Sequence, residues 1–165
     1  MRIFSKKIKA LTALIVVSVA LVPAIALAAG FGPSRPTFNW VSPPNYITFN
    51  SFTDNPVVGD ERAFMDARDA TTTTYSDSNT VTTDGQEFVV TSYVHNNAAE
   101  GLGLVAQNTT FRASLSTTPA ASHEITGFIS ASNSNPGTVF DTTVFTGSKP
   151  FTLEYVPGSA KLRTN

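Results

Sequence analysis

Two sets of side chains in this sequence could do chemistry, and the larger is a run of carboxylates. Five acidic residues fall within sixteen positions: Asp54, Asp60, Glu61, Asp66 and Asp69. A calcium ion takes about six to eight oxygen ligands, often from acidic loops. These five residues follow no EF-hand spacing, however. We therefore predict a solvated turn and a polar strand face, with a calcium site as the alternative.

The smaller set is the pair of histidines, His95 and His123. If they met across a sheet they would still lack a third ligand, and two imidazoles alone make a poor metal site. His95 is followed by Asn96 and Asn97, whose side chains stabilise turns by bonding to nearby backbone. We expect His95 to hydrogen-bond within a turn, and we predict no metal ligand and no cofactor.

The sequence contains no arrangement that is typical of an enzyme. A G-x-S-x-G turn would indicate a serine hydrolase but is missing, and Gly158-Ser159-Ala160 fits an ordinary turn. Four glutamates have no glycosidase motif around them: Glu87, Glu100, Glu124 and Glu154. Most of them lie in predicted strands, where an outward charge keeps the exposed face soluble. We predict no catalytic residue and a protein that is not an enzyme.

An aromatic-rich segment near the N-terminus has two interpretations. Its rings are Phe38, Trp40, Tyr46, Phe49 and Phe52. Buried rings would belong to the core, whereas exposed rings would form a platform on which sugars stack. We favour the core, with the sugar-binding platform as the alternative. The sequon at Asn108-Thr109-Thr110 falls on a predicted strand and is taken as coincidental.

The segment 1–28 has the three-part pattern of a signal peptide. Four basic residues come first: Arg2, Lys6, Lys7 and Lys9. The apolar stretch Ala10–Val22 follows, and Ala26 and Ala28 then form the A-x-A arrangement that precedes cleavage. The alternative is an uncleaved helical anchor, because residues 10–29 are about long enough to cross a bilayer. We predict a helical signal peptide cleaved after Ala28, and thus a secreted or cell-surface protein.

The composition of the remaining residues 29–165 narrows the classes of partner. They carry seven basic and twelve acidic side chains, a net charge of −5, and the basic residues are scattered singly. Nucleic-acid binding needs a basic patch that releases counterions, so nucleic acid is excluded as a partner. The chain has no cysteine, which excludes disulfides and thiolate metal sites. These 137 residues suffice for one domain with its own core.

Short β-strands must position these side chains. Residues 29–45 hold four prolines and are predicted to be an extended lead-in. Turn signals about ten residues apart separate five predicted strands: Tyr46–Thr53, Arg62–Ala70, His123–Ala131, Val139–Thr146 and Phe151–Val156. Arg62–Ala70 also has residues that favour helix, and Thr71–Thr83 fits an edge strand or a loop. We predict a loop at Thr117–Ser122 and a turn at Gly147–Pro150.

The central stretch Gln86–Ser116 predicts two more strands joined by a glycine-containing loop. These strands form either a hairpin or a crossover between sheets. Phe111 shares period-two register with Thr109, Ala113 and Leu115, so we expect it to point into the core. All these strands together predict one all-β domain over residues 46–165, an immunoglobulin-like β-sandwich.

Four segments resemble a known group of proteins. They are Gly59-Asp60-Glu61-Arg62, Tyr93-Val94-His95-Asn96-Asn97-Ala98, Ala106 with Asn108-Thr109, and Tyr155-Val156-Pro157-Gly158-Ser159-Ala160. Over residues 54–165 the chain is similar to uncharacterised exported bacterial proteins with immunoglobulin-like surface modules. The resemblance implies a surface module without a cofactor or catalytic residue. It also implies further strands after Tyr155–Ala160, so we expect an incomplete C-terminal edge and self-association.

These observations favour a non-enzymatic module with a structural or adhesive role, whose loops, chiefly Ala98–Leu104, contact other surface proteins or glycans. The alternative function is a carbohydrate-binding module that uses the N-terminal aromatics. Contact with a membrane is expected only through an uncleaved leader.

The leader generates the first testable prediction. We expect the exported chain to begin at Ala29, because Ala26 and Ala28 fit the specificity of signal peptidase. Intact-mass measurement of the secreted protein checks this. A product that begins at Met1 and stays in the membrane fraction would show that the leader is an anchor.

Overall fold

The computed structural model describes residues 30–164, and the predicted leader lies outside them. This part of the chain forms six strands and no helix: β1 (Met65–Asp69), β2 (Ser78–Val81), β3 (Phe88–Ser92), β4 (Thr110–Leu115), β5 (Ala120–Ser130) and β6 (Thr138–Phe151). No helix in this range is therefore long and apolar enough to cross a membrane. The predicted all-β class is confirmed.

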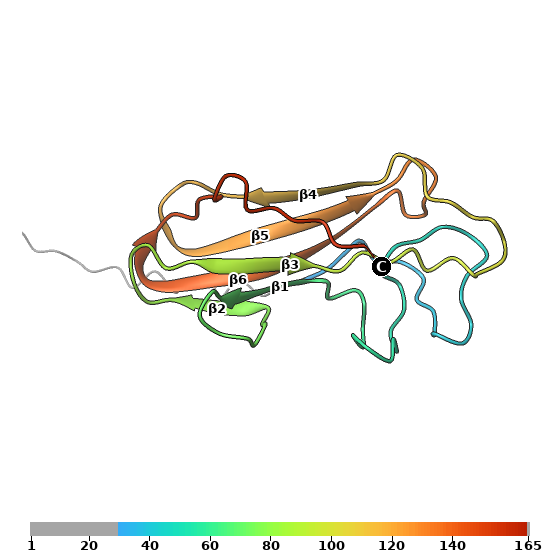
Figure 1. Cartoon of the computed structure of the whole chain (residues 1–165), viewed down its shortest axis with the longest axis horizontal. Coiled ribbons are helices and arrows are strands. Elements are labelled where there is room, and N and C mark those ends of the chain that lie inside the picture. The colour runs from blue at the N-terminus through green and yellow to red at the C-terminus, as the bar shows by residue number, and fades with distance from the viewer. Residues whose placement is uncertain (1–29, 165) are drawn as a thin grey trace, which may run out of the picture.

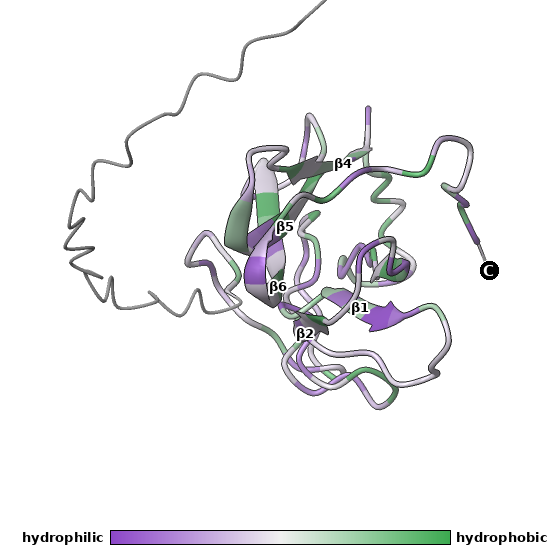
Figure 2. Cartoon of the chain, turned by 90° about the vertical axis from the view of Figure 1, so that its left-hand side faces the viewer, coloured by the Kyte–Doolittle hydropathy of each residue, from purple (hydrophilic) through white to green (hydrophobic). Residues whose placement is uncertain are grey.

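The strands form two sheets in a sandwich-like arrangement (Figure 1). The larger sheet has the order β2-β6-β5-β4, in which β2 runs parallel to β6 and the other pairs are antiparallel. The smaller sheet is the antiparallel pair β1-β3. Figure 2 shows the larger sheet from its end, from β4 through β5 and β6 to β2, with β1 beside it.

The core lies between the two sheets, where β5 turns alternate side chains inward and β6 is buried continuously from Asp141 to Phe145. On β5 the side chains of His123, Ile125 and Ile129 face inward, and Gly127 leaves room for Met65 of β1. The ring of Phe88 on β3 packs edge-on against Phe145 of β6, with the ring centroids 5.1 Å apart. Loop residues complete the core, among them Ile47, Phe49 and Phe64.

The prediction of a strand at Tyr46–Thr53 is wrong. Residues Ile47–Phe52 are all buried, yet they form only isolated bridges, such as Phe49 with Asn96. A left-handed backbone at Asn50, with φ of 48°, prevents a continuous ladder. Buried side chains and cross-links to residues 95–97 hold the segment in place instead.

Of the two alternatives for the central stretch, the crossover is confirmed and the hairpin is wrong. β3 pairs with β1 in the smaller sheet, whereas β4 pairs with β5 in the larger one. The loop between them, residues 93–109, passes over one end of the domain (Figure 1). The strand alternatives for Arg62–Ala70 and for part of Thr71–Thr83 are confirmed as β1 and β2.

The burial predicted for Phe111 is also wrong. Its partner across the ladder is the fully buried Ile129, so both side chains are on the core-facing side of the sheet. Phe111 is nevertheless 47% exposed, because β4 is an outer strand and no strand of the smaller sheet covers it. The side of β4 on which Phe111 lies was therefore predicted correctly, but no strand of the second sheet covers that side.

Near the C-terminus one predicted break is shorter than expected, because only residues 116–119 separate β4 from β5, and the other does not occur. β5 begins at Ala120, inside the predicted loop Thr117–Ser122. β6 continues to Phe151 through the predicted turn Gly147–Pro150, because Phe151 pairs with Ala120 beyond an irregularity in the ladder. Thr152–Val156, which was expected to be part of a strand, has no strand pairing. The lead-in is extended but reaches the sheet, where Gly32 pairs with Phe140.

The packing predicts contrasting effects for two phenylalanines. Phe145→Ala should lower the free energy of unfolding by about 3–5 kcal/mol, because the ring is fully buried. Phe111→Ala should lower it by roughly 1 kcal/mol or less, because half of the ring already meets solvent. Urea unfolding of both variants checks this, and a larger loss for Phe111→Ala would contradict the described packing.

Candidate functional site

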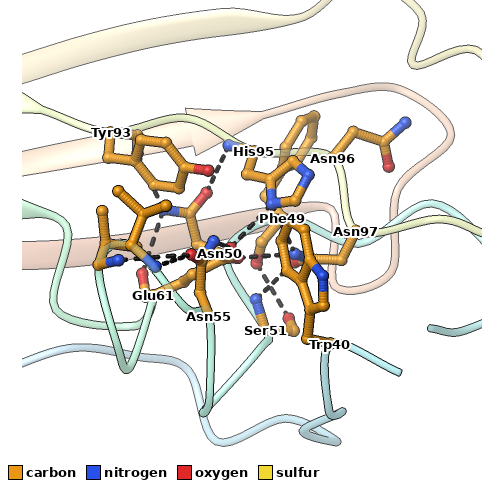
Figure 3. A network of polar contacts seen from close by, with 12 residues as sticks. Trp40, Phe49, Asn50, Ser51, Asn55, Glu61, Tyr93, His95, Asn96 and Asn97 are labelled. Atoms are coloured by element: carbon orange, nitrogen blue, oxygen red, sulfur yellow. Dashed lines mark hydrogen bonds and ion pairs between the residues drawn. The ribbon is translucent and has the colours of Figure 1, made fainter. Parts of the chain in front are cut away.

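The centre of the candidate site is the carboxylate of Glu61, which is only 1% exposed. Its Oε1 accepts hydrogen bonds from Asn55 Nδ2 at 2.5 Å and from His95 Nδ1 at 2.8 Å. Its Oε2 accepts one from Asn97 Nδ2 at 2.6 Å. A buried carboxylate is stable only when its oxygens are bonded in this way. Figure 3 shows the amides and the imidazole converging on it.

Two loop segments at one end of the sandwich supply these groups, and a third, residues 47–52, joins them through its backbone (Figure 1). Glu61 follows the turn at Gly59, Asn55 lies before it, and His95 and Asn97 follow β3. Backbone hydrogen bonds join the segments, from Asn50 N to His95 O at 3.1 Å and from Asn97 N to Thr48 O at 2.9 Å. Thus the network replaces regular sheet pairing at this end.

Asn50 is the second buried anchor of the network. Its Nδ2 donates to the carbonyls of Glu61 and Tyr93, at 3.1 and 2.8 Å, and its Oδ1 accepts from His95 N at 2.9 Å. Asparagine tolerates the left-handed φ of 48° better than most residues. Such backbone strain persists where surrounding contacts fix it, and here three side-chain hydrogen bonds do so.

Further hydrogen bonds hold the segment 47–52 in place. Asn97 Oδ1 accepts from Ser51 N at 2.6 Å, so Asn97 connects Glu61 to the backbone of the 47–52 segment. From the lead-in, Arg35 donates to Asn50 O at 2.6 Å and to Ser51 Oγ at 3.1 Å. Hydrogen bonds therefore join the lead-in to the network, through Arg35, as well as to β6, through Gly32.

His95 connects the buried carboxylate to the surface. Its imidazole lies among three aromatic rings, with centroid distances of 5.9 Å to Trp40, 5.6 Å to Phe52 and 5.9 Å to Tyr93. Phe52 is buried, whereas Trp40 is 45% exposed and Tyr93 is also exposed. We call Trp40, Tyr93 and His95 the aromatic patch; Figure 3 shows the Trp40 and His95 rings close together on one side of Glu61.

The protonation state of Glu61 sets the chemistry of His95. Burial alone would raise the pKa of Glu61, but hydrogen bonds from His95, Asn97 and Asn55 hold this pKa below its ordinary value. The carboxylate is therefore ionised at neutral pH and can only accept hydrogen bonds, so His95 Nδ1 donates. This fixes the imidazole with Nε2 as the atom left for contact with a ligand.

The five carboxylates of the predicted acidic stretch do not converge on one point. Asp60 pairs with Arg62 at 2.6 Å, Asp54 accepts from Trp40 N, and Asp69 bonds to Thr71 and Gln86. Within residues 30–164 no group of three or more His, Cys, Asp or Glu side chains could hold a metal ion. The calcium alternative therefore has no site in this part of the chain.

Two further acidic groups are Asp66 on β1 and Asp141 on β6. Asp141 is buried, and burial raises its pKa to about 6 even though its carboxylate accepts hydrogen bonds from Phe64 N and Met65 N, the latter at 2.7 Å. Burial and a hydrogen bond with Asp77 raise the pKa of Asp66 as well. Both groups therefore keep their protons up to a pH of about 6, higher than an ordinary aspartate does.

The structure separates the two histidines. His123 faces the core on β5, where its Nε2 donates to Phe151 O at 2.7 Å and its ring packs on Phe151. Among the N-terminal aromatics, Phe49 and Phe52 are buried as expected, whereas Trp40 is at the surface. The aromatic patch thus combines one predicted ring, Trp40, with two residues from another segment.

Sequence reasoning placed His95 with Asn96 and Asn97 in a turn but missed the network itself. The missing partners are Asn50, Asn55 and Glu61, which lie far from His95 in sequence. The signal available was the density of asparagines near both Glu61 and His95. Short amide side chains of this kind are suited to bonding a buried carboxylate and irregular backbone.

Removal of the central carboxylate gives a prediction about stability. Glu61→Ala should lower the free energy of unfolding by about 3–5 kcal/mol, because it leaves buried amide donors without an acceptor. The matched control is Asp60→Ala, which removes a neighbouring, half-exposed ion pair and should cost about 1 kcal/mol or less. Equal losses in urea unfolding would show that the network contributes little.

The shifted pKa values predict how stability changes with pH. Asp141, with its pKa raised to about 6, stabilises the fold when protonated, and this contribution is lost as the pH rises through 6. Asp66 acts in the same direction. Glu61, with its pKa lowered, stabilises the fold above its ordinary pKa of 4.5, and its contribution is lost as the pH falls further.

We therefore expect stability to be greatest at about pH 4 to 4.5 and to fall as the pH rises to about 6, with a lower unfolding midpoint in urea at pH 7.5. Asp66→Asn should flatten the decline between pH 5 and pH 7.5, because the amide cannot ionise. A midpoint that rises steadily from pH 5 to pH 7.5 would contradict the assignment.

Comparison with known proteins gives no relative from which a role for this site could be transferred. No family model, no curated protein and no solved structure matches the chain. The interpretation therefore rests on the geometry: a buried carboxylate, two amides and an imidazole that together support an exposed aromatic patch.

Proposed function

We propose that this chain is an exported, non-enzymatic module of the cell surface, with an immunoglobulin-like sandwich that acts by adhesion. The supporting observation is the set of groups that surround its most reactive pair of side chains, Glu61 and His95. Within residues 30–164 the His95 ring donates from Nδ1 to Glu61, and Asn97 Nδ2 lies 3.2 Å from the same nitrogen, so no hydroxyl nucleophile is among its neighbours in hydrogen-bond range. A Glu–His pair needs such a nucleophile for acyl transfer, so this pair serves as a structural tie.

The loop end of the domain provides the contact surface for adhesion. The loop 98–104 follows the network directly, and the bond from Ala99 N to Pro44 O, at 2.8 Å, fastens its base. Leu104 packs against the core, while Leu102 is 53% exposed at the tip. Gly101 and Gly103 both have left-handed φ, of 77° and 65°, which shapes the loop between these two leucines. An apolar tip on a rigid base is suited to recognition.

Adhesion of the secreted chain to cells of the producing strain tests this proposal. Leu102→Asp should reduce binding of the purified chain to those cells at least about fivefold, because it places a charge at the centre of the contact. Val57→Asp is the matched control, since Val57 is also exposed but lies in the separate turn Asn55–Gly59. Equal binding by both variants and the wild type would contradict adhesion through this loop.

A second candidate function is carbohydrate binding, and the aromatic patch supports it. Trp40 presents an exposed ring beside His95, whose Nε2 is free to accept a hydrogen bond from a sugar hydroxyl. An aromatic ring next to a fixed polar group is a common design for stacking a pyranose. The buried network holds the imidazole rigidly, which lowers the entropic cost of binding.

Glycan-array binding separates the two candidates. If the patch binds sugars, Trp40→Ala should abolish the array signal, whereas the matched control Val41→Ala, at an exposed neighbouring position, should leave it unchanged. Absence of any glycan signal from the wild type, with cell adhesion intact, would leave adhesion as the function and contradict sugar binding.

A further inference from the structure

One side of the sandwich, between β3 and β4, lacks a covering strand. Val90 on β3 pairs with the fully buried Ala67, and Phe111 on β4 pairs with Ile129, so both face the core. They are nevertheless 38% and 47% exposed. We call this opening, lined by Val90, Phe111, Ala113 and Leu115, the open seam. Apolar side chains that face the core and yet are this exposed indicate that a further strand could pack over them.

The strands that border the open seam also have free edges. β4 pairs only with β5, and β3 only with β1. Within residues 30–164 no further backbone hydrogen bond reaches residues 88–92 or 110–115. A free edge beside an uncovered apolar face is a template for one additional strand.

The segment Thr152–Val156 has the sequence of such a strand but no strand partner. Its β-favouring residues Thr152, Tyr155 and Val156 are all exposed, and Leu153 makes its contact with the core. The segment continues from the end of β6 and runs back along the domain (Figure 1). The backbone bond in this C-terminal segment is the local turn from Ser159 N to Val156 O, at 3.2 Å.

Thr152–Val156 matches the free edge of β4 in one antiparallel register. With Glu154 opposite Arg112, Leu153 lies opposite Ala113 and Tyr155 lies opposite Phe111. The large Leu153 side chain then meets a small one, the Tyr155 ring covers the exposed Phe111, and the outward pair has opposite charges. Arg112 is already on the outer face, because its guanidinium lies 4.7 Å from the centroid of the Phe128 ring.

The segment cannot reach this register within its own chain. Phe151 is opposite Ala120 of β5, whereas Ser114, the partner of Thr152 in the register above, is opposite Thr126. Six residues along a strand span about 20 Å. One residue from Phe151 to Thr152 spans about 3.8 Å. The strand that completes the ladder must therefore come from another copy.

We propose that two copies of this chain associate by strand addition, with Thr152–Val156 of each copy pairing antiparallel to β4 of the other and closing the open seam. The exchange is reciprocal, because each copy has both a free β4 edge and a segment without strand pairing, whose Leu153 leaves the core of its own chain to join the ladder of the partner. It also buries Phe111, Leu153 and Tyr155 on the same face. The interaction surface is thus distinct from the loop end that carries the adhesive and sugar-binding candidates.

Disulfide cross-linking tests the register directly, since the natural chain has no cysteine. Single-cysteine chains with Ala113→Cys and Leu153→Cys, given different tags and mixed under mild oxidation, should form a mixed cross-linked dimer. Directly opposite residues of antiparallel strands are at about the Cα distance that a disulfide requires. The control pairs Ala113→Cys with Glu154→Cys, which points to the opposite face, and should give roughly tenfold less product.

A charge exchange gives a second, independent measurement on full-length folded chains. Arg112→Glu alone and Glu154→Arg alone should each weaken dimerisation in sedimentation by roughly threefold to tenfold. The chain that carries both changes should regain wild-type affinity, because the ion pair is restored with its signs reversed. Both positions are exposed, so these variants should fold.

Three outcomes would overturn the proposal. One is a folded wild-type chain that stays monomeric at millimolar concentration. Another is cross-linking by the Glu154→Cys control as efficient as by Leu153→Cys. The third is a double cysteine chain, Ala113→Cys with Leu153→Cys, that closes its disulfide within a monomer, because this would place the strand in its own seam.

Discussion

The rest of the structure depends on the burial of one negative charge. The Glu61 carboxylate receives hydrogen bonds from Asn55, which precedes β1, and from His95 and Asn97, which lie in the crossover after β3. Leaving such a charge unbonded in the interior would be costly, so the three loop segments are held in a single arrangement. A domain without disulfides thereby obtains a rigid loop end from amide side chains.

The two flanks of the domain are built in opposite ways. At the loop end, hydrogen bonds between side chains and backbone cross-link the irregular segments and support the aromatic patch and the 98–104 loop. Along the side between β3 and β4, regular strands leave backbone edges free and core-facing side chains exposed. Bonded irregular structure favours a precise surface for ligands, whereas free regular edges favour pairing with another strand.

Much of the fold could be predicted from period-two patterns, because β5 alternates between the core and the opposite face, although Asp141–Phe145 of β6 are buried without alternation. The pattern could not show that Phe111, in correct register, would have nothing above it, since coverage depends on which strands form the second sheet. The segment 47–52 was mistaken for a strand because apolar Ile47 and Phe49 alternate with polar Thr48 and Asn50, whereas the structure buries all of these residues. The site was partly foreseen at His95, but Glu61 was assigned to a solvated turn, since long-range amide contacts leave no periodic signal.

Native-state hydrogen exchange of the backbone amides of Asn50, Ser51, His95 and Asn97 tests the central claim most directly. All four lie outside the strands, yet each donates to the network or to its connected backbone. If the Glu61 network fixes this end, these amides should exchange only through global unfolding, as slowly as those of β5 and β6. Exchange as fast as in the exposed loop 71–75 would contradict the account.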